Sequence, residues 1–249
     1  MLRLLRRPIW LVGLVVAVVA TATFVALGRW QLRRLEEKRE LRRSVAERLA
    51  APPLDLDALG RPLDAHDAYR RIEAAGRYLR EDEVVVLARS LHGRSGNELL
   101  TPFETNGGRI LLVDRGWLPL DVETVAARAP EGPVVVEGVL RPSEDFGPLG
   151  PIDERPLRRV GRIDVEAIGA ALGLEVEPLW VALVAQRPAQ PGELPLPLPP
   201  PTVSEGPHLG YAIQWFAFAG VVVAGFPVLV WRRSRRVSPA EPSTPSSVP

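Results

Sequence analysis

The sequence contains no cysteine and only three histidines among its 249 residues. The absence of cysteine excludes disulfides, thiolate metal sites, haem attached through cysteine and cysteine nucleophiles. It does not identify a compartment, because an oxidising compartment permits disulfides without requiring them. The formal net charge is only +1, so the sequence lacks the clustered basic surplus of a nucleic-acid-binding protein, and we expect no nucleic-acid partner.

Two long runs without a charged residue dominate the organisation of the chain. Pro8 to Gly28 is 21 residues long and Leu209 to Trp231 is 23, and a helix needs about 20 apolar residues to cross a bilayer. The first run has an alternative interpretation as a cleaved signal peptide, since three arginines precede it and Ala20-Thr21-Ala22 resembles a cleavage site. The run continues to Leu27, beyond that site, so we favour a retained membrane anchor.

The distribution of positive charge predicts the orientation of these two spans. No Lys or Arg lies between Arg187 and Arg232, whereas four arginines lie within residues 232–236. The positive-inside rule places the C-terminus in the cytoplasm, and two spans place the N-terminus there too. Aromatic residues would then mark the two interfaces: Trp10 and Trp231 the inner, Trp30 and Tyr211 the outer. Only eight residues precede the first span, too few for a transit peptide, so we expect a bacterial plasma membrane.

Composition divides the rest of the chain. Residues 29–50 contain good helix formers and no Gly or Pro, which predicts a charged helical stalk, and the prolines after residue 187 predict an extended linker. The predicted order is a cytoplasmic N-terminus (1–8), a transmembrane helix (9–28), the stalk (29–50), an extracytoplasmic β-rich domain (51–187), the linker (188–208), a second transmembrane helix (209–231) and a cytoplasmic tail (232–249).

The β-rich domain consists of short apolar stretches separated by glycine and polar turns. The predicted strands are Tyr69 to Tyr78, Glu83 to Ser90, Glu98 to Glu104, Ile110 to Gly116, Val134 to Leu140 and Leu179 to Ala185. Continuous apolar runs in the second and fourth predict strands covered on both faces. Two short helices are expected, each starting at an Asp suited to N-capping, Asp121 and Asp164. We therefore predict a membrane protein in which two transmembrane helices flank a mainly antiparallel β domain, a small barrel or curled sheet with two short helices.

Two of the histidines lie in polar loops. His92 lies between Ser90 and Ser95, but the nucleophile elbow G-x-S-x-G is absent, so a polar turn is favoured over a Ser–His hydrolase. His66 has neighbouring aspartates but no second histidine nearby, so a solvated loop is favoured over a metal site.

The third histidine opens the second apolar run. On a helix, His208, Tyr211, Trp215 and Phe218 share one face, which would pack against another helix or a planar ligand. Imidazole is a good axial ligand for haem iron. The alternative, favoured on spacing alone, is an interfacial His and Tyr that anchor the helix end while Trp215 faces lipid.

The stretch Asp114-Arg115-Gly116-Trp117 ends one predicted strand with a charge pair beside an aromatic side chain. Trp and Arg dominate interface hot spots, which would suit a partner-binding edge. We favour the structural interpretation, in which Asp114 or another carboxylate holds Arg115 and Trp117 lies in the core.

Four motifs in order resemble those of the Surfeit locus protein 1 family over nearly the whole length. The motif residues are Gly28, Trp30, Gln31 and Arg34 after the first run; Tyr69, Arg70 and Gly76 in the first strand; Thr101-Pro102-Phe103 and Asp114-Arg115-Gly116-Trp117-x-Pro119; and His208, Tyr211 and Trp215.

The resemblance implies a non-enzymatic assembly factor for haem-copper cytochrome c oxidase. It implies two transmembrane helices around an outer domain, and assistance to haem a insertion into, or maturation of, the catalytic subunit. The implied partners are that subunit, the haem a synthase and the lipid bilayer. Haem a would be a transient cofactor contacted by His208, Tyr211 and Trp215. Arg115 and Trp117 would share a role that is not catalytic.

Two departures and two alternatives accompany this resemblance. Arg159, Gly161 and Arg162 stand where the family often has an aromatic residue, and Glu205-Gly206-Pro207 replaces an Asn that often precedes the histidine. The first alternative is a membrane scaffold that binds the immature oxidase subunit without contacting haem. The second is a membrane-anchored hydrolase around His92.

Overall fold

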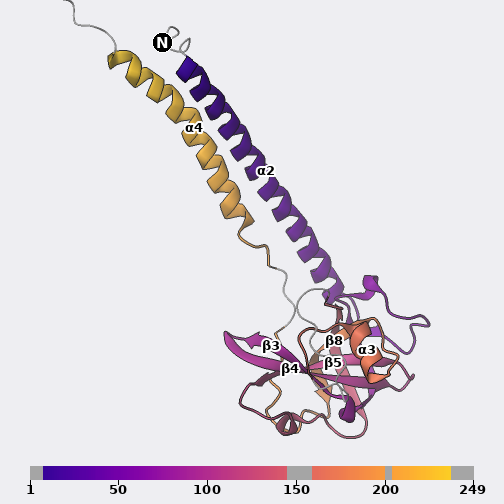
Figure 1. Ribbon diagram of the computed structural model, residues 1–249. Coiled ribbons are helices and arrows are strands. Elements are labelled where there is room, and N and C mark those ends of the chain that lie inside the picture. Colours follow the sequence, from indigo (N-terminus) through magenta and orange to yellow (C-terminus); the bar gives the residue numbers. More distant parts are fainter. Residues whose placement is uncertain (1–7, 145–158, 200–203, 237–249) are drawn as a thin grey trace, which may run out of the picture. The chain divides into compact units, whose positions relative to one another are not determined.

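The computed structural model describes residues 8–144, 159–199 and 204–236. The chain divides into two compact units, one of Met1–Arg43 with Val203–Pro249 and one of Ser44–Thr202. Helices dominate the first unit and strands the second (Figure 1).

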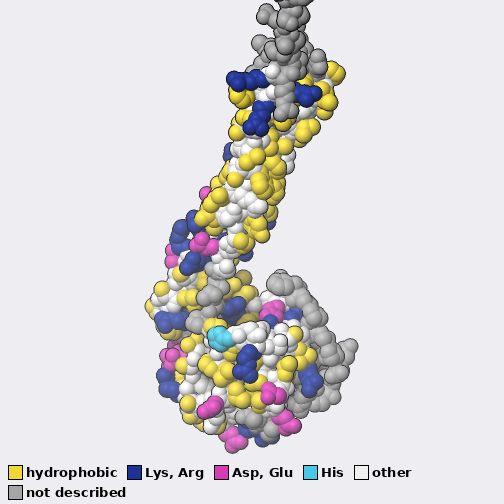
Figure 2. All heavy atoms as spheres, turned by 90° about the vertical axis from the view of Figure 1, so that its left-hand side faces the viewer, with side chains coloured by type: hydrophobic (Ala, Val, Ile, Leu, Met, Phe, Trp, Pro, Cys, Tyr) yellow, Lys and Arg dark blue, Asp and Glu magenta, His cyan; other side chains and the backbone are white. Residues whose placement is uncertain are grey.

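Two long helices form the helical unit: α2 (Pro8–Ala50), which continues past Arg43, and α4 (His208–Arg236). The predicted first span and the predicted stalk are thus one uninterrupted helix, as expected because residues 29–50 contain neither Pro nor Gly. Both helices are long and apolar enough to cross a membrane. A band of hydrophobic side chains covers the helical unit, with Lys and Arg beyond both of its ends (Figure 2).

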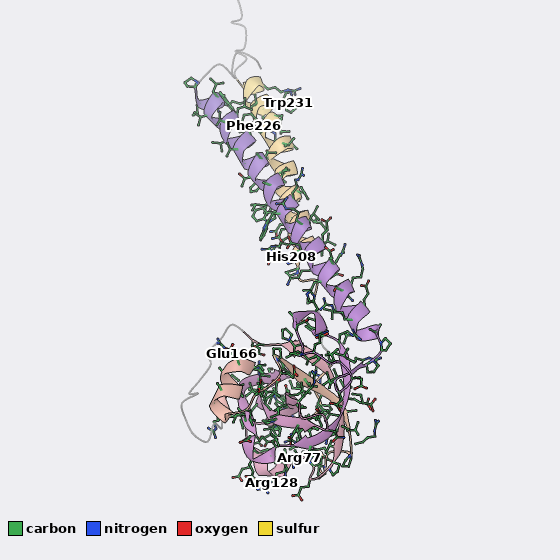
Figure 3. All side chains as sticks on the ribbon, turned by 90° about the vertical axis from the view of Figure 1, so that its right-hand side faces the viewer. Arg77, Arg128, Glu166, His208, Phe226 and Trp231 are labelled. Carbon is green, nitrogen blue, oxygen red and sulfur yellow. The ribbon has the colours of Figure 1, made fainter. Side chains whose placement is uncertain are left out.

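Ring contacts set α2 and α4 antiparallel. Trp10 meets Phe226 with ring centroids 6.5 Å apart, and Phe24 stacks on Trp215 at 5.7 Å. At Gly28 an added Cβ would lie 2.8 Å from the ring of Phe216, so the absence of a side chain there lets the helices approach closely. Figure 3 shows His208 at one end of α4, with Phe226 and Trp231 towards the other.

The β-rich unit is built on eight strands within its described residues. They are β1 (Leu54–Asp55), β2 (Arg71–Tyr78), β3 (Val84–Leu91), β4 (Arg94–Thr105), β5 (Ile110–Pro119), β6 (Val134–Pro142), β7 (Arg159–Val160) and β8 (Leu179–Arg187). Short 3-10 helices are η1 (Ala65–Asp67), η2 (Arg80–Asp82) and η3 (Thr124–Ala127).

Five of these strands close into a ring, in the order β2-β6-β8-β5-β4, because β2 pairs with both β6 and β4. The β5–β8 pair is parallel and the other pairs of the ring are antiparallel. The predicted mainly antiparallel small barrel is therefore confirmed. Closure leaves fewer strand edges open to other chains, and β3 adds to β4 outside the ring.

The ring closes at Gly76. This residue pairs with Val134 of β6 and Thr105 of β4, and an added Cβ would lie 2.0 Å from the carbonyl oxygen of Glu104. No side chain fits at that distance, so the crossing of β2 and β4 requires glycine.

One of the two predicted short helices forms as expected. α3 (Val165–Leu172) begins after Asp164, whose side chain accepts from the backbone N–H of Ala167 at 3.2 Å. The helix predicted after Asp121 is wrong: only η3 forms, and no side chain caps it. Pro119 and Pro130 bracket this segment, and β-branched residues within it weaken helix formation further.

β5 is covered on both faces, as predicted. Leu111 and Val113 belong to the core inside the barrel, while Leu112 packs with Ile168 of α3. The same prediction holds for β3 only in its first half. Val84 and Val86 are buried in one cluster and Val85 packs on the other face against Leu99, Leu118 and Ala127, whereas Ala88 and Ser90 are exposed.

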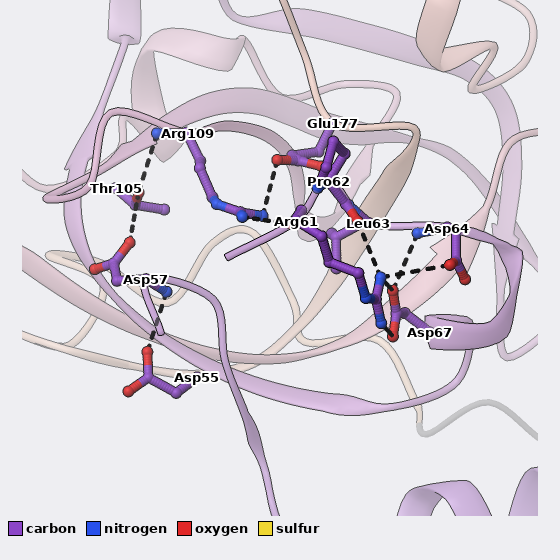
Figure 4. Close-up of polar contacts among 10 residues, drawn as sticks. All are labelled: Asp55, Asp57, Arg61, Pro62, Leu63, Asp64, Asp67, Thr105, Arg109 and Glu177. Carbon is purple, nitrogen blue, oxygen red and sulfur yellow. Dashed lines mark hydrogen bonds and ion pairs between the residues drawn. The ribbon is translucent and has the colours of Figure 1, made fainter. Parts of the chain in front are cut away.

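Polar contacts hold the segment between β1 and β2 on the barrel (Figure 4). Arg61 forms a two-pronged ion pair with Asp67 at 2.7 and 2.9 Å, which holds the pKa of that carboxyl below its usual range. Glu177 accepts from Arg109 at 3.0 Å and from the backbone N–H of Leu63 at 2.8 Å. A segment with little regular structure is thereby fixed to the barrel wall.

We expect Gly76→Ala to destabilise the β-rich unit by about 3 kcal/mol, because the methyl group would collide with the backbone of β4. Gly107→Ala is the matched control, since its Cβ would meet only the Asp57 carboxylate, which can move. Chemical denaturation of the detergent-solubilised protein, followed by near-ultraviolet circular dichroism, measures both. Equal losses in the two variants would contradict a special constraint at Gly76.

Candidate functional site

His208 is the first residue of α4, and its side chain reaches α2. Its Nδ1 lies 2.8 Å from Oε1 of Gln31, and Gln31 is 9% exposed. An amide oxygen can only accept a hydrogen bond, so this contact fits the tautomer with the proton on Nδ1. In the neutral ring the Nε2 atom then keeps its lone pair, which is the tautomer that can bind a metal.

The sequence predicts one contact surface on α4 from His208, Tyr211, Trp215 and Phe218, and part of this face forms it. Trp215 stacks on Phe24, and Phe218 contacts the same ring at 5.7 Å. Trp215 therefore packs against α2 and does not face away from it. Tyr211 is 48% exposed and lies outside this contact. Sequence reasoning placed Gln31 in a motif, but not opposite His208.

The segment before His208 is held by charge. Glu205 pairs with Arg39 at 3.2 Å and Arg42 at 3.0 Å, and the hydrogen bond from Arg39 lowers the pKa of Glu205. The carbonyl of Pro207 accepts from the N–H of Tyr211 at 3.2 Å, which starts the helix. The sequence departure at Glu205-Gly206-Pro207 thus carries its own ion pairs to α2.

Trp30 and Arg34 lie on the exposed part of α2. The Arg34 guanidinium lies 5.8 Å from the ring centroid of Trp30, which is 43% exposed, and Arg34 also pairs with Glu37 at 2.8 Å. Neither side chain contacts His208, so the motif residues of α2 fall into two groups, with Gln31 alone facing the histidine.

In the β-rich unit the predicted motif residues surround a buried guanidinium. The Nε of Arg115 donates to Thr101 Oγ1 at 2.9 Å, and Nη2 donates to Glu83 Oε2 at 2.5 Å and to the carbonyl of Ala127 at 2.6 Å. Nη1 donates to Gln190 at 3.1 Å. The carboxylate that holds Arg115 is therefore Glu83, which sequence reasoning did not identify because it lies 32 residues away.

Asp114 points to a different neighbour. It is fully buried: one oxygen accepts from the N–H of Gly116 at 3.0 Å, and the other has no hydrogen-bond partner within the described residues. Burial and the neighbouring Glu98 carboxylate raise the pKa of Asp114 well above its ordinary value. A raised pKa favours the protonated form of the Asp114 carboxyl, and the neighbouring Glu98 pairs with Arg89 at 3.0 Å.

The remaining motif residues shape the barrel wall. Trp117 is 1% exposed, and Gly96 leaves room for its ring. Gly116 adopts φ +131, and an added Cβ there would lie 2.3 Å from the carbonyl oxygen of Leu196. In the β4–β5 ladder, Pro102 stands opposite Leu112 and Pro119 stands opposite Gly96. Burial of Arg115 and Trp117 supports the structural interpretation of this motif over an exposed partner-binding edge.

The proline-rich segment begins on the barrel. Trp117 and Leu196 exchange two backbone hydrogen bonds of 2.8 Å each, and Gln190 donates to the carbonyl of Arg128 at 2.7 Å. The segment that follows β8 is thus part of the wall around Arg115.

The other two histidines lie in turns. His92 and Gly93 both have positive φ in the tight turn between β3 and β4, and His92 is exposed. His66 is exposed in η1. Within the described residues no group of three or more His, Cys, Asp or Glu side chains could hold a metal ion.

The fold and these contacts define a class of protein in which a small β-barrel is inserted in sequence between two antiparallel apolar helices. A model of the SURF1 family matches residues 18–220, so the chain belongs to the SURF1 family. An uncharacterized SURF1-like protein of Mycobacterium tuberculosis is 29% identical and covers 99% of this chain and 94% of its own length. SURF1-like proteins of Rickettsia bellii and Monosiga brevicollis are each 28% identical, covering 80% and 83% of this chain and 83% and 82% of their own.

We expect Arg115→Lys to lower the free energy of unfolding by about 3 kcal/mol, because one ammonium cannot replace a planar group that bonds to four partners. Arg94→Lys is the control: Arg94 is exposed and lies 5.7 Å from the ring centroid of Trp117, so its loss should cost below about 1 kcal/mol. Urea denaturation compares the two. A negligible loss in Arg115→Lys would show that the guanidinium network contributes little.

Asp114 gives the stability a distinctive pH dependence. The folded protein holds this proton while the unfolded chain releases it near pH 4, so its contribution is complete below about pH 4 and is lost as pH rises through the raised pKa. Asp114→Asn keeps the acceptor for Gly116 without this titration. We expect the variant to be at least as stable as the parent at pH 8, with a flatter profile of unfolding free energy above about pH 4. A steeper decline would contradict a protonated Asp114.

Proposed function

We propose that this protein is an assembly factor for haem-copper cytochrome c oxidase, which assists haem a insertion into, or maturation of, the catalytic subunit. Membership of the SURF1 family supports the general role. The observation that carries the haem component is the hydrogen bond between His208 and Gln31, because it leaves Nε2 of the imidazole able to bind iron.

In this proposal α2 and α4 span a bacterial plasma membrane, with both termini in the cytoplasm and the β-rich unit outside. Their length and apolar composition support the spans. The four arginines within residues 232–236 support a cytoplasmic C-terminus by the positive-inside rule. Gln31 and His208 then lie close to the outer interface, at the ends of the apolar stretches.

The residues around His208 fit a planar, largely apolar cofactor with one axial nitrogen ligand. His208 supplies the nitrogen, Gln31 fixes the ring orientation, and Trp215 and Phe24 supply aromatic surface. Such an outer hydrogen bond also raises the basicity of a ligating imidazole. When bound, haem a would supply only the iron that accepts the lone pair, since the role is retention and handover. Tyr211, being exposed, is available to a partner such as the catalytic subunit or the haem a synthase.

The second candidate function is a membrane scaffold that binds the immature oxidase subunit without contacting haem. The same hydrogen bond favours it, because a part-buried Gln–His pair also holds two helices together within a low-dielectric environment. The two functions differ at the Nε2 atom of His208, which binds haem iron in the first and contacts no haem in the second.

Absorption spectra decide between them. The full-length protein is co-expressed with haem a-synthesising enzymes and purified as the parent, His208→Ala, Gln31→Leu and His92→Ala. We expect haem a in the parent and in His92→Ala, none in His208→Ala, and occupancy about tenfold to a hundredfold weaker in Gln31→Leu. His92 is the matched control because it is an exposed histidine in a turn.

Haem absent from every sample, with oxidase maturation still dependent on the protein, would reject the haem role and leave the scaffold. Haem retained in His208→Ala would show that another residue supplies the ligand. Maturation that does not depend on the protein at all would reject both functions.

A further inference from the structure

A polar cavity of about 360 Å³ opens in the wall of the β-rich unit, beside the buried Arg115 network. Three of its lining residues are arginines from different elements: Arg80 of η2, Arg128 directly after η3, and Arg159 of β7. A second cavity of about 460 Å³ is also lined by Arg80 and Arg128. Figure 3 labels Arg128, which lies at the lower edge of this unit in that view.

The positive charge of this cavity is only partly neutralised. Arg80 pairs with Glu131, and the two lining carboxylates are both engaged: Glu83 by Arg115, and Glu81 in an interaction of its own. The guanidinium groups of Arg128 and Arg159 have no hydrogen bond or ion pair to any described residue. Within the part of the chain that the structure describes, both side chains therefore have donors available to an anion in the cavity.

The backbones of Arg128 and Arg159 are anchored, and both side chains are exposed. Gln190 donates to the carbonyl of Arg128 at 2.7 Å, and Arg159 stands opposite Val85 in the parallel β3–β7 pair. Planar guanidinium groups on anchored backbones suit the paired oxygens of carboxylates and phosphates.

We propose that this cavity binds a small multivalent oxyanion, a polycarboxylate or a phosphate compound, between Arg128 and Arg159. The volume lies at the small end of ligand sites, which suits a compact anion. Arg80 adds a third positive group at the wall shared by the two cavities. The inference does not depend on haem, because every residue that it uses lies in the β-rich unit.

An anion bound in the cavity would be linked to the buried Arg115 network through Glu83. This side chain lines the cavity, accepts from Arg115 at 2.5 Å and accepts from Thr101 at 2.9 Å. An anion that approaches Arg128 and Arg159 binds the folded unit alone, since the unfolded chain does not bring these residues together. Binding should therefore raise the unfolding temperature of this unit.

Isothermal titration of the detergent-solubilised full-length protein at low ionic strength tests the proposal, with inorganic phosphate and citrate as separate probes. We expect at least one probe to bind, and Arg128→Gln or Arg159→Gln to weaken it by about tenfold or more. Arg77→Gln is the control, because Arg77 is an exposed arginine that pairs with Glu104 and does not line either cavity. Its affinity should equal that of the parent.

Binding of phosphate but not citrate would assign the site to phosphate compounds, and the reverse result would assign it to carboxylates. Absence of binding by both probes would overturn the proposal. Equal affinity in the parent and the double variant Arg128→Gln/Arg159→Gln would also overturn it. Thermal denaturation of each variant without ligand shows whether the unit is still folded, and a folded variant that loses the probe-dependent rise in unfolding temperature confirms the site.

Discussion

The β-rich unit depends on one buried cation. Arg115 projects from β5 and bonds to Thr101 of β4, to Glu83 before β3, to η3 and to the segment after β8, while its guanidinium lies 5.8 Å from the ring centroid of Tyr78 on β2. A charge in such a site is tolerated only when its donors are satisfied, so each of these segments is restricted to one position. The wall of the adjacent arginine-lined cavity is fixed by the same contacts.

A different kind of interaction sets the alignment of the two helices in the helical unit. Its apolar helices meet through aromatic rings and through the close approach at Gly28, contacts that define how near the helices lie but discriminate weakly among sliding registers. Gln31 with His208, and Glu205 with Arg39 and Arg42, add polar contacts that only one register satisfies. The residue with a proposed chemical role is thus also one that sets the alignment.

The sequence was most informative where periodicity and local chemistry decide the outcome. The two apolar helices, the six long strands and the Asp164 cap are local features, and all are confirmed. Barrel closure was predicted only as a class, since the β2–β4 pairing depends on distant residues. The partner of Arg115 could not be predicted, because no local signal distinguishes Glu83 from other carboxylates. The pairing of Gln31 with His208 was missed for the same reason, although both residues belonged to recognised motifs.

The separation of 177 residues between Gln31 and His208 has a consequence during synthesis. α2 emerges first, whereas α4, which packs closely against it at Gly28, is made only after the entire barrel. At about 5–20 residues per second, α2 waits roughly ten to thirty-five seconds for that partner. During this interval its Gln31 side chain and the surface around Gly28 are open to any other apolar helix nearby. Pairing of the two ends of the chain is therefore possible only late in synthesis, after the first helix has been exposed to other helices.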